Sequence, residues 1–436
     1  MSAVAQSVTA LARLGGAQAG LPGGPRSDER RRAALQRLVA LGLPTPRDEA
    51  WKYTNLRLLE RRDLAPAPPR PLPAGALSAL PPRQGPTLVF VDGRFHPALS
   101  STALPDGVEF TPLATLLAGE LPPAIEARVG AGDSVDERIR LMNAALLGDG
   151  ALLTFTAGRT PELPLHLVHV ATGGGAYPRL LVSIEAGAAA RLVEYHLTLG
   201  DSDSVAIPVT DLVLGASARL EHYSIGLAGP RAIQLEDVAV RLDRDAEYQH
   251  LHVGLGGQLA RLDLRVRLEG HGAATQLAGL FIADRSRQLD IRTRIDHLAA
   301  HTTSDQVYRG VANDRGRGSY DGMVVVHPGA IKADSQQSSR NLLLGPQASI
   351  DARPQLEIKA DDVKCSHGAA TGALDEQMLF YLLSRGLDRD TARALLTFAF
   401  AGDVITRLRV PELRPFVAER VLGSLPTAPL IREFVQ

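Results

Sequence analysis

The sequence predicts a mainly β fold with α-helical ends, in which the central strands are stacked as a β-solenoid. From about residue 151 the apolar residues form short runs with strand-like alternation. Turns of small residues separate these runs and recur about every 26 to 30 residues, and later about every 15 to 17. Helical periodicity returns only after residue 372. Strands at regular intervals without long helices between them are typical of stacked coils, because each coil completes the core of its neighbours.

The central strands and turns are defined by their residue types. Strands are expected at 180–184, 190–195, 210–214, 218–223, 238–242 and 262–268. Turns are expected at 186–188, 215–217, 243–246, 270–273, 329–330, 345–348 and 360–362. A β-sandwich of antiparallel strands gives a similar pattern and remains the alternative. The steady turn interval and the polar positions Gln336, Gln337 and Asn341 favour coils.

The first 150 residues are predicted to be mainly helical. Ser27 and Asp28 are N-cap residue types, and the helix that follows them should end near Gly42. Ser134 and Glu137 form a capping box for a second helix. A proline-rich segment at 65–86 predicts an extended linker, and residues 87–95 predict a strand with a turn at 92–93.

Three further helices are expected at the C-terminal end, after residue 372. The first should bury an apolar stripe of Leu374, Met378, Tyr381 and Leu382, and the second should run from about residue 390 to 402. The third follows Pro411. Such a helical module could cap the open end of a solenoid or bind a partner.

The composition excludes several classes of protein. A chain of 436 residues with 45% hydrophobic residues can bury a large core and should form two or three domains. A net charge of −1 argues against nucleic-acid binding, which usually needs a basic surface. The N-terminus lacks the features of a signal peptide, and no apolar run is long enough to cross a membrane. We therefore expect a cytoplasmic protein with no membrane or nucleic-acid partner.

Known catalytic motifs are missing from the sequence. It contains no P-loop, so we expect no ATP hydrolysis by the P-loop mechanism, and it contains no Gly-x-Ser-x-Gly elbow. A β-helix enzyme that cleaves polysaccharides is one alternative, although no spacing identifies a catalytic carboxylate pair. Three histidine pairs have ligand-like spacing but lack a nearby cysteine or a helical carboxylate partner, and are therefore interpreted as structural: 166 with 169, 250 with 252, and 297 with 301.

The strongest candidate site lies at the end of the solenoid, in residues 335–372. Its last strand-like run carries Cys365, the single cysteine of the chain, two residues before His367. Residues i and i+2 share one face of a strand, so both side chains should point the same way. A thiolate beside an imidazole suits iron or zinc. A buried cysteine and a hydrogen-bonded histidine are the alternative interpretation.

The same region resembles a known family. Residues 342–358, 364–369 and 380–386 resemble the SufD family, subunits of the SUF (SufBCD) scaffold for iron–sulfur cluster assembly. The similarity extends to residues 322–326, 329–330 and 51–54. It implies a right-handed parallel β-helix core at 151–372, flanked by an N-terminal helical domain with a proline-rich linker at 1–150 and a C-terminal helical domain at 373–436.

The resemblance also implies a function. The chain would be a non-catalytic scaffold that pairs with the related subunit SufB and with the ATPase SufC. His367 and Cys365 would be metal ligands shared with SufB at a transient iron–sulfur cluster, and the isolated chain would bind no cofactor. Ile358 stands where SufB carries its main cysteine. Arg385, Gly386 and Phe398 fall in the segment that would bind a partner. A purely structural partner of SufB without ligands is the alternative, and an exposed last strand leaves homodimerisation open.

Overall fold

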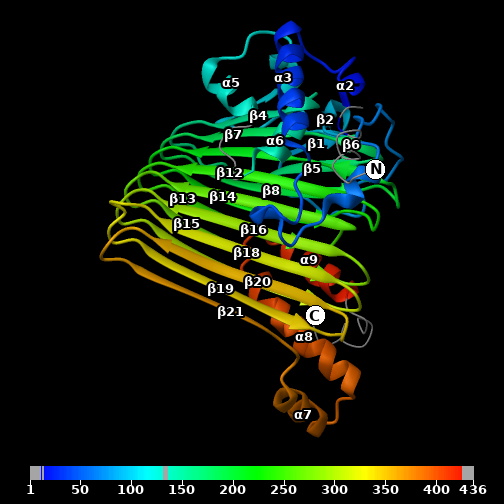
Figure 1. The fold of residues 1–436 in the computed structure, drawn as a ribbon, viewed down its shortest axis with the longest axis vertical. Coiled ribbons are helices and arrows are strands. Elements are labelled where there is room, and N and C mark those ends of the chain that lie inside the picture. Colours follow the sequence, from blue (N-terminus) through cyan, green and yellow to red (C-terminus); the bar gives the residue numbers. More distant parts are fainter. Residues whose placement is uncertain (1–10, 12–13, 131–135, 425–436) are drawn as a thin grey trace.

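The computed structural model describes residue 11 and residues 14–130 and 136–424. Within these residues the strands form two sheets that wind together as a parallel β-solenoid, with helices at both ends (Figure 1). Neighbouring strands are parallel except in the pairs β1–β2 and β3–β4. The solenoid prediction is therefore confirmed, and the sandwich alternative is wrong.

Successive coils place one strand in each sheet. The 10-stranded sheet contains, in spatial order, β2 (Arg94–Phe95), β1 (Thr87–Val91), β5 (Leu165–Ala171), β8 (Ala189–Thr198), β11 (Arg219–Leu227), β13 (Glu247–Gly254), β15 (Ala274–Ala283), β17 (Thr303–Ala312), β19 (Asp334–Leu343) and β21 (Lys364–Gly372). The 11-stranded sheet contains β20 (Ser349–Ile358), β18 (Arg317–Val326), β16 (Gln288–His297), β14 (Leu259–Leu268), β12 (Ile233–Leu242), β10 (Val209–Leu214), β7 (Arg179–Ile184), β4 (Gly150–Phe155) and β3 (Val108–Pro112), with β6 (Gly174–Ala176) and β9 (Ser204–Ala206) beside this path.

The turns between coils repeat one backbone conformation. A residue with positive φ occupies each turn that precedes a strand of the 10-stranded sheet, for example Ser217 at 57° and Asp245 at 57°. The amide of Ser217 donates to the carbonyl of Arg244 in the next coil, and the amide of Asp245 donates to that of His271. Glycine, serine and aspartate suit this conformation and recur at this point, which explains much of the periodic turn signal, although His301 and Lys332 adopt it in later coils.

Two apolar layers cover the two faces of the 10-stranded sheet. Between the sheets, residues such as Leu192, Leu220 and Val240 form the interior core of the solenoid. On the outer face, residues such as Val193 and Ile225 pack against the C-terminal helices. This face is apolar because it is covered, which explains why strands of this sheet are buried on both sides.

The N-terminal helices cover the first coils. They are α2 (Leu14–Ala17), α3 (Pro25–Leu41), α4 (Leu113–Leu117), α5 (Pro123–Val129) and α6 (Glu137–Ala145), with short 3₁₀ turns η1 (Glu49–Trp51), η2 (Leu56–Arg61) and η3 (Pro97–Leu99). The predicted cap of α3 is wrong, because Gly24 is the N-cap and Pro25 the first helical residue, so Ser27 falls inside the first turn. The predicted end at Gly42 is confirmed.

Some predictions fall outside the described residues. Ser134 of the predicted capping box lies outside them, and α6 is capped by Asp136, whose side chain accepts from the amide of Arg138. The first ten residues, on which the signal-peptide prediction rests, and residues 425–436 lie outside them as well.

The predicted strand and turn at 87–95 are confirmed, and β1 pairs with β5, so sheet structure begins before residue 151. The division into three domains remains a prediction.

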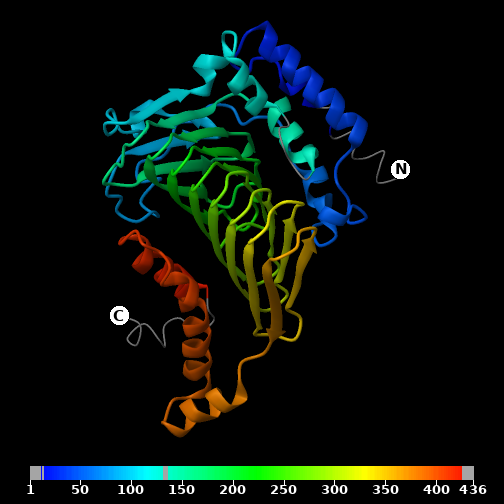
Figure 2. The same ribbon diagram turned by 90° about the vertical axis from the view of Figure 1, so that its left-hand side faces the viewer.

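The C-terminal helices are α7 (Glu376–Ser384), α8 (Arg389–Ile405) and α9 (Leu413–Gly423). Helices α8 and α9 lie along the outer face of the 10-stranded sheet, and α7 projects beyond β21 (Figure 2). They leave the edges of β20 and β21 uncovered, so these helices do not cap the solenoid. The predicted stripe of α7 is also wrong: Leu379 is its buried residue, whereas Met378 and Tyr381 are 58% and 56% exposed.

Candidate functional site

The candidate site lies on β21, which is the last strand of its sheet. β21 pairs with β19 on one side and has no described strand on the other. Eight of its nine residues are exposed, and only Cys365 is half-buried. β20 forms the corresponding edge of the second sheet. The solenoid therefore ends in two uncovered parallel strands, one from each sheet.

Cys365 and His367 continue the interior column of the solenoid. Cys365 is in register with Ser335 and His367 with Gln337, and both partners are buried. Because in-register residues of stacked coils face the same way, the two side chains of β21 face the mouth of the interior. No described strand lies above them, so His367 remains exposed. The structure thus brings the two predicted ligand residues to one face, at a surface.

The interior below these residues is polar. Ser304 Oγ donates to Ser335 Oγ at 2.9 Å, and Ser304 Oγ lies 2.9 Å from His297 Nε2. Burial lowers the pKa of His297 to about 4, so this imidazole is neutral at physiological pH. A column of hydroxyl and imidazole groups therefore leads from the interior to the thiol of Cys365.

The Cys365 thiol is not activated by its surroundings. Burial raises its pKa, and the nearby carboxylate of Asp334 raises it further, against a smaller opposing effect of the Ser335 amide. A thiol in this setting stays protonated at neutral pH and becomes a ligand only when a metal displaces the proton. The exposed imidazole of His367 is the more accessible donor of the two.

The backbone of β21 presents hydrogen-bonding groups to a missing neighbour. The amide of Lys364 donates to Ala333, and alternate residues of a strand point their amides to opposite sides. The amides of Cys365, His367, Ala369 and Thr371 therefore face the free edge. Such a row of unpaired groups is a template for another strand.

The edge of β20 is different, because it contains a proline. The amides of Ser349 and Lys359 donate to Gly316 and Val326 of the preceding coil. Because the amide direction alternates from residue to residue, position 354 faces the free edge of β20. Pro354 has no N–H, so the row of free amides is interrupted there. β21 is therefore the strand of this coil with an unbroken row of free amides.

Two of the three predicted partner-binding residues lie at the end of the projecting helix α7, and the third lies on α8. Arg385 is its C-cap, exposed, with its guanidinium 5.1 Å from the ring centroid of Tyr381. Gly386 follows with φ of 89°, a conformation that favours glycine. Phe398 lies on α8, half-buried against Ala394 and Leu422. The structure therefore places Arg385 and Gly386 at the surface and Phe398 partly in a core.

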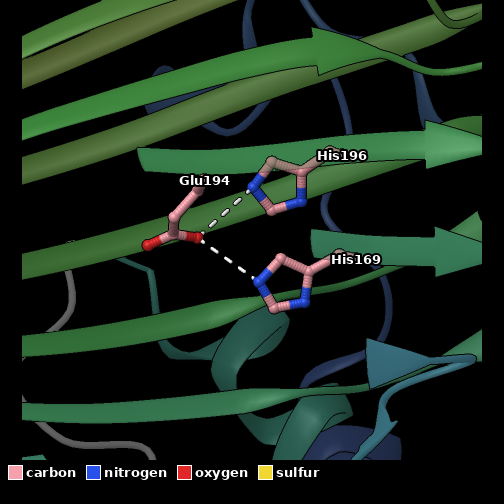
Figure 3. Close-up of side chains that lie close together, drawn as sticks. All are labelled: His169, Glu194 and His196. Carbon is pink, nitrogen blue, oxygen red and sulfur yellow. Dashed lines mark ion pairs between the residues drawn. The ribbon is translucent and has the colours of Figure 1, made fainter. Parts of the chain in front are cut away.

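A second group of ligand-type residues lies inside the solenoid. His169 on β5 and Glu194 and His196 on β8 are all buried and point toward one another (Figure 3). The spacing of histidines in the sequence indicated His169 only as one of a pair with His166, and it gave no indication of Glu194 or His196. The strand pairing of β5 with β8 is what brings them together. A Glu-x-His spacing on one strand was the signal that could have been used.

Within the described residues, no helix has both the length and the apolar character that a bilayer crossing requires.

Comparison with known proteins agrees with this architecture. Residues 167–400 match the family described as "SUF system FeS cluster assembly, SufBD core domain". The chain is 29% identical to the iron–sulfur cluster assembly protein SufD of Escherichia coli, over 90% of this chain and 92% of that protein. It is 28% identical to a SufBD family protein of Synechocystis over 88% of each chain. It is also 29% identical to a chloroplast protein of Arabidopsis thaliana, over 91% of this chain and 85% of that one.

The family match covers more than half of the chain and includes every strand from β7 to β21. The chain belongs to the SufBD family of the SUF iron–sulfur cluster assembly system, and it is SufD-like.

Proposed function

We propose that this chain is a non-catalytic, cytoplasmic scaffold subunit that pairs with SufB through β21. His367 and Cys365 would then hold a nascent iron–sulfur cluster jointly with ligands from SufB. The cluster is the cargo of the assembly and leaves it, so the isolated chain holds none. One observation carries this proposal: both ligand-type residues lie on the uncovered strand that also has free backbone amides.

The geometry explains why the site would be shared. A strand added to the free edge of β21 would lie about 4.8 Å away and continue the stack of coils. Its inward side chains would then face the column that ends in Cys365 and His367. Two donors from this chain cannot complete a four-coordinate iron site, so the remaining ligands must come from the added strand. Ile358, exposed at 48% on β20, offers no ligand atom.

The projecting helix α7 supports a second contact, with the ATPase SufC. Met378, Phe380 and Tyr381 are 58%, 72% and 56% exposed, although apolar residues of a helix are normally covered. Arg385 and Gly386 adjoin this surface, which would dock SufC. Movement of SufC during its ATP cycle would be transmitted through α8 to the solenoid, because Asp403 of α8 pairs with Arg309 of β17.

The proposal is tested by expressing this chain together with SufB and SufC. H367A should leave the amount of assembled complex unchanged and reduce the iron and sulfide recovered on it several-fold. C365S should have the same or a smaller effect. H271A is the matched control, because His271 is an exposed histidine in a turn of an earlier coil.

The two readouts separate the proposal from its alternative. Intact assembly with normal cluster yield in both H367A and C365S would contradict shared ligation and support a purely structural partner. Without SufB, the same edge would pair with a second copy of this chain. Size-exclusion chromatography with light scattering, with and without SufB, measures whether the homodimer is replaced by the complex with SufB.

A further inference from the structure

The interior group of His169, Glu194 and His196 has an arrangement that differs from an ordinary buried ion pair. His169 is in register with His196, and Glu194 lies two residues before His196, so all three face the interior. Their exposed fractions are 8%, 1% and 4%. They belong to the first coils of the solenoid, well away from the free edge.

The distances within the group are too long for hydrogen bonds. Glu194 Oε2 lies 3.6 Å from His169 Nε2 and 3.4 Å from His196 Nε2, and the three ligand atoms all lie within 4.8 Å of one another. None of these three atoms has a hydrogen-bond partner among the described residues. These atoms are held only by long ion-pair contacts, and burying them without hydrogen bonds of normal length is costly, since almost all buried polar groups are satisfied.

A metal ion would account for this spacing. Two ligand atoms about 2.1 Å from a tetrahedral ion lie about 3.4 Å apart, close to both measured separations. A cavity of about 20 Å³ lies beside the two imidazoles; its lining is mainly apolar and includes His169, His196 and Gln234 but not Glu194. A volume of that size holds one water molecule or one ion.

Neighbouring residues fix the orientation of the carboxylate. Glu194 Oε1 lies 3.0 Å from His222 Nε2, and the other ring nitrogen of His222 lies 3.0 Å from the hydroxyl of Tyr248. One oxygen of Glu194 is thus held by a buried chain of partners, while the other points at the two imidazoles. A ligand carboxylate held by outer hydrogen bonds is a usual feature of metal sites. Glu236 Oε1, 3.9 Å from His196 Nε2, is a further donor within reach.

We propose that His169, Glu194 and His196 bind one divalent first-row transition-metal ion inside the solenoid. Two imidazoles and one carboxylate are the donor set of many Fe²⁺ and Zn²⁺ sites. Six strand spacings separate β8 from β21, or about 29 Å, so this site is distinct from the shared edge. It does not depend on the function proposed for His367.

The test uses the full chain, freed of metal by a chelator, and Co²⁺ as a spectroscopic probe. We expect one equivalent of Co²⁺ per chain with visible d–d absorption, displaced by Zn²⁺. H169Q, H196Q and E194Q should each weaken binding by more than about a hundredfold, because changes that only misorient a ligand already cost about ten- to a hundredfold. Bound metal should raise the melting temperature of the wild type and of none of these variants.

H166Q is the matched control. His166 is a buried histidine on the same strand, three residues away, and its Nε2 lies 3.2 Å from the carbonyl of Gln84 on the other face. H166Q and H367A should both bind Co²⁺ as the wild type does. The proposal is overturned if the wild type binds neither Co²⁺ nor Zn²⁺, or if the double variant H169Q/H196Q keeps its affinity. If a histidine variant fails to fold, E194Q replaces it in the test, because glutamine keeps the shape of the glutamate side chain.

Discussion

The two ends of the solenoid are built from the same coils but are finished differently. At the first end, antiparallel β2 and β3 close the two sheets, and helices pack against them. Asp149 ties this end together by accepting from the amides of Phe95 and Ala114 at 2.9 and 2.8 Å. At the other end, no described strand or helix closes the edges of β20 and β21, although Arg353 of β20 pairs with Glu49. The contacts of the first end stabilise the fold, whereas the open end leaves backbone groups free for the pairing proposed above.

The largest expected effect concerns the covered side of the solenoid, where the segment around Trp51 packs on Arg261 of β14. Trp51 is buried, its Nε1 donates to Asp136 Oδ2 at 2.7 Å, and the guanidinium of Arg261 lies 4.0 Å from its ring. W51A should lower the free energy of unfolding by about 3–5 kcal/mol, because it leaves a large cavity and removes one of the hydrogen bonds to Asp136, which Arg138 still pairs. Denaturant unfolding measures this change.

The matching substitution at the open end is I358A. Because Ile358 is half exposed, its truncation should cost about 0.5 kcal/mol or less. Equal costs for W51A and I358A would show that the covered side of the solenoid and its open end contribute alike to stability, and would contradict the contrast between covered and uncovered parts.

The second effect concerns strand pairing at the open end. A369P removes an amide that faces the free edge, whereas A370P removes one that faces β19. A369P should keep the melting temperature and weaken SufB binding by about tenfold or more, because the proline ring obstructs an added strand and one hydrogen bond is lost. Melting curves and co-purification with SufB measure the two properties.

A370P is the control, and it should lower both stability and binding. If A369P binds SufB as the wild type does, β21 is not the pairing strand.

A further expected effect is a pH dependence of stability that arises from the polar interior near the open end. The pKa of His297 is about 4 in the folded chain, below its ordinary value of 6.5, because burial disfavours the charged imidazole. The unfolded chain therefore takes up this proton first, and stability falls as the pH drops from about 6.5 to 4. H297N should reduce that slope by about 1.4 kcal/mol per pH unit, measured by urea unfolding at several pH values. An unchanged slope would show that His297 does not titrate in this way.

Much of the fold follows from local signals, and the exceptions have physical reasons. The turns were predictable because each coil needs a residue with positive φ, as at Ser217 and Asp245. The exposure of Met378 was not predictable, since periodicity shows that a helix has an apolar face and cannot show what covers it.

Of the two candidate sites, one was also predictable from the sequence and the other was not. Cys365 and His367 are two residues apart on one strand, so their common face could be predicted. His169 meets Glu194 only through the register of two coils, which depends on the number of residues in each turn.

Pro354 has a consequence for the size of the assemblies this chain can form. A solenoid with extendable strands at both ends would add copies without limit, as a filament does. Here one terminus is sealed, and at the other a single proline interrupts one of the two growing edges. A union through the open ends of two solenoids would therefore leave no further strand to extend, and would stop at a body of two solenoids.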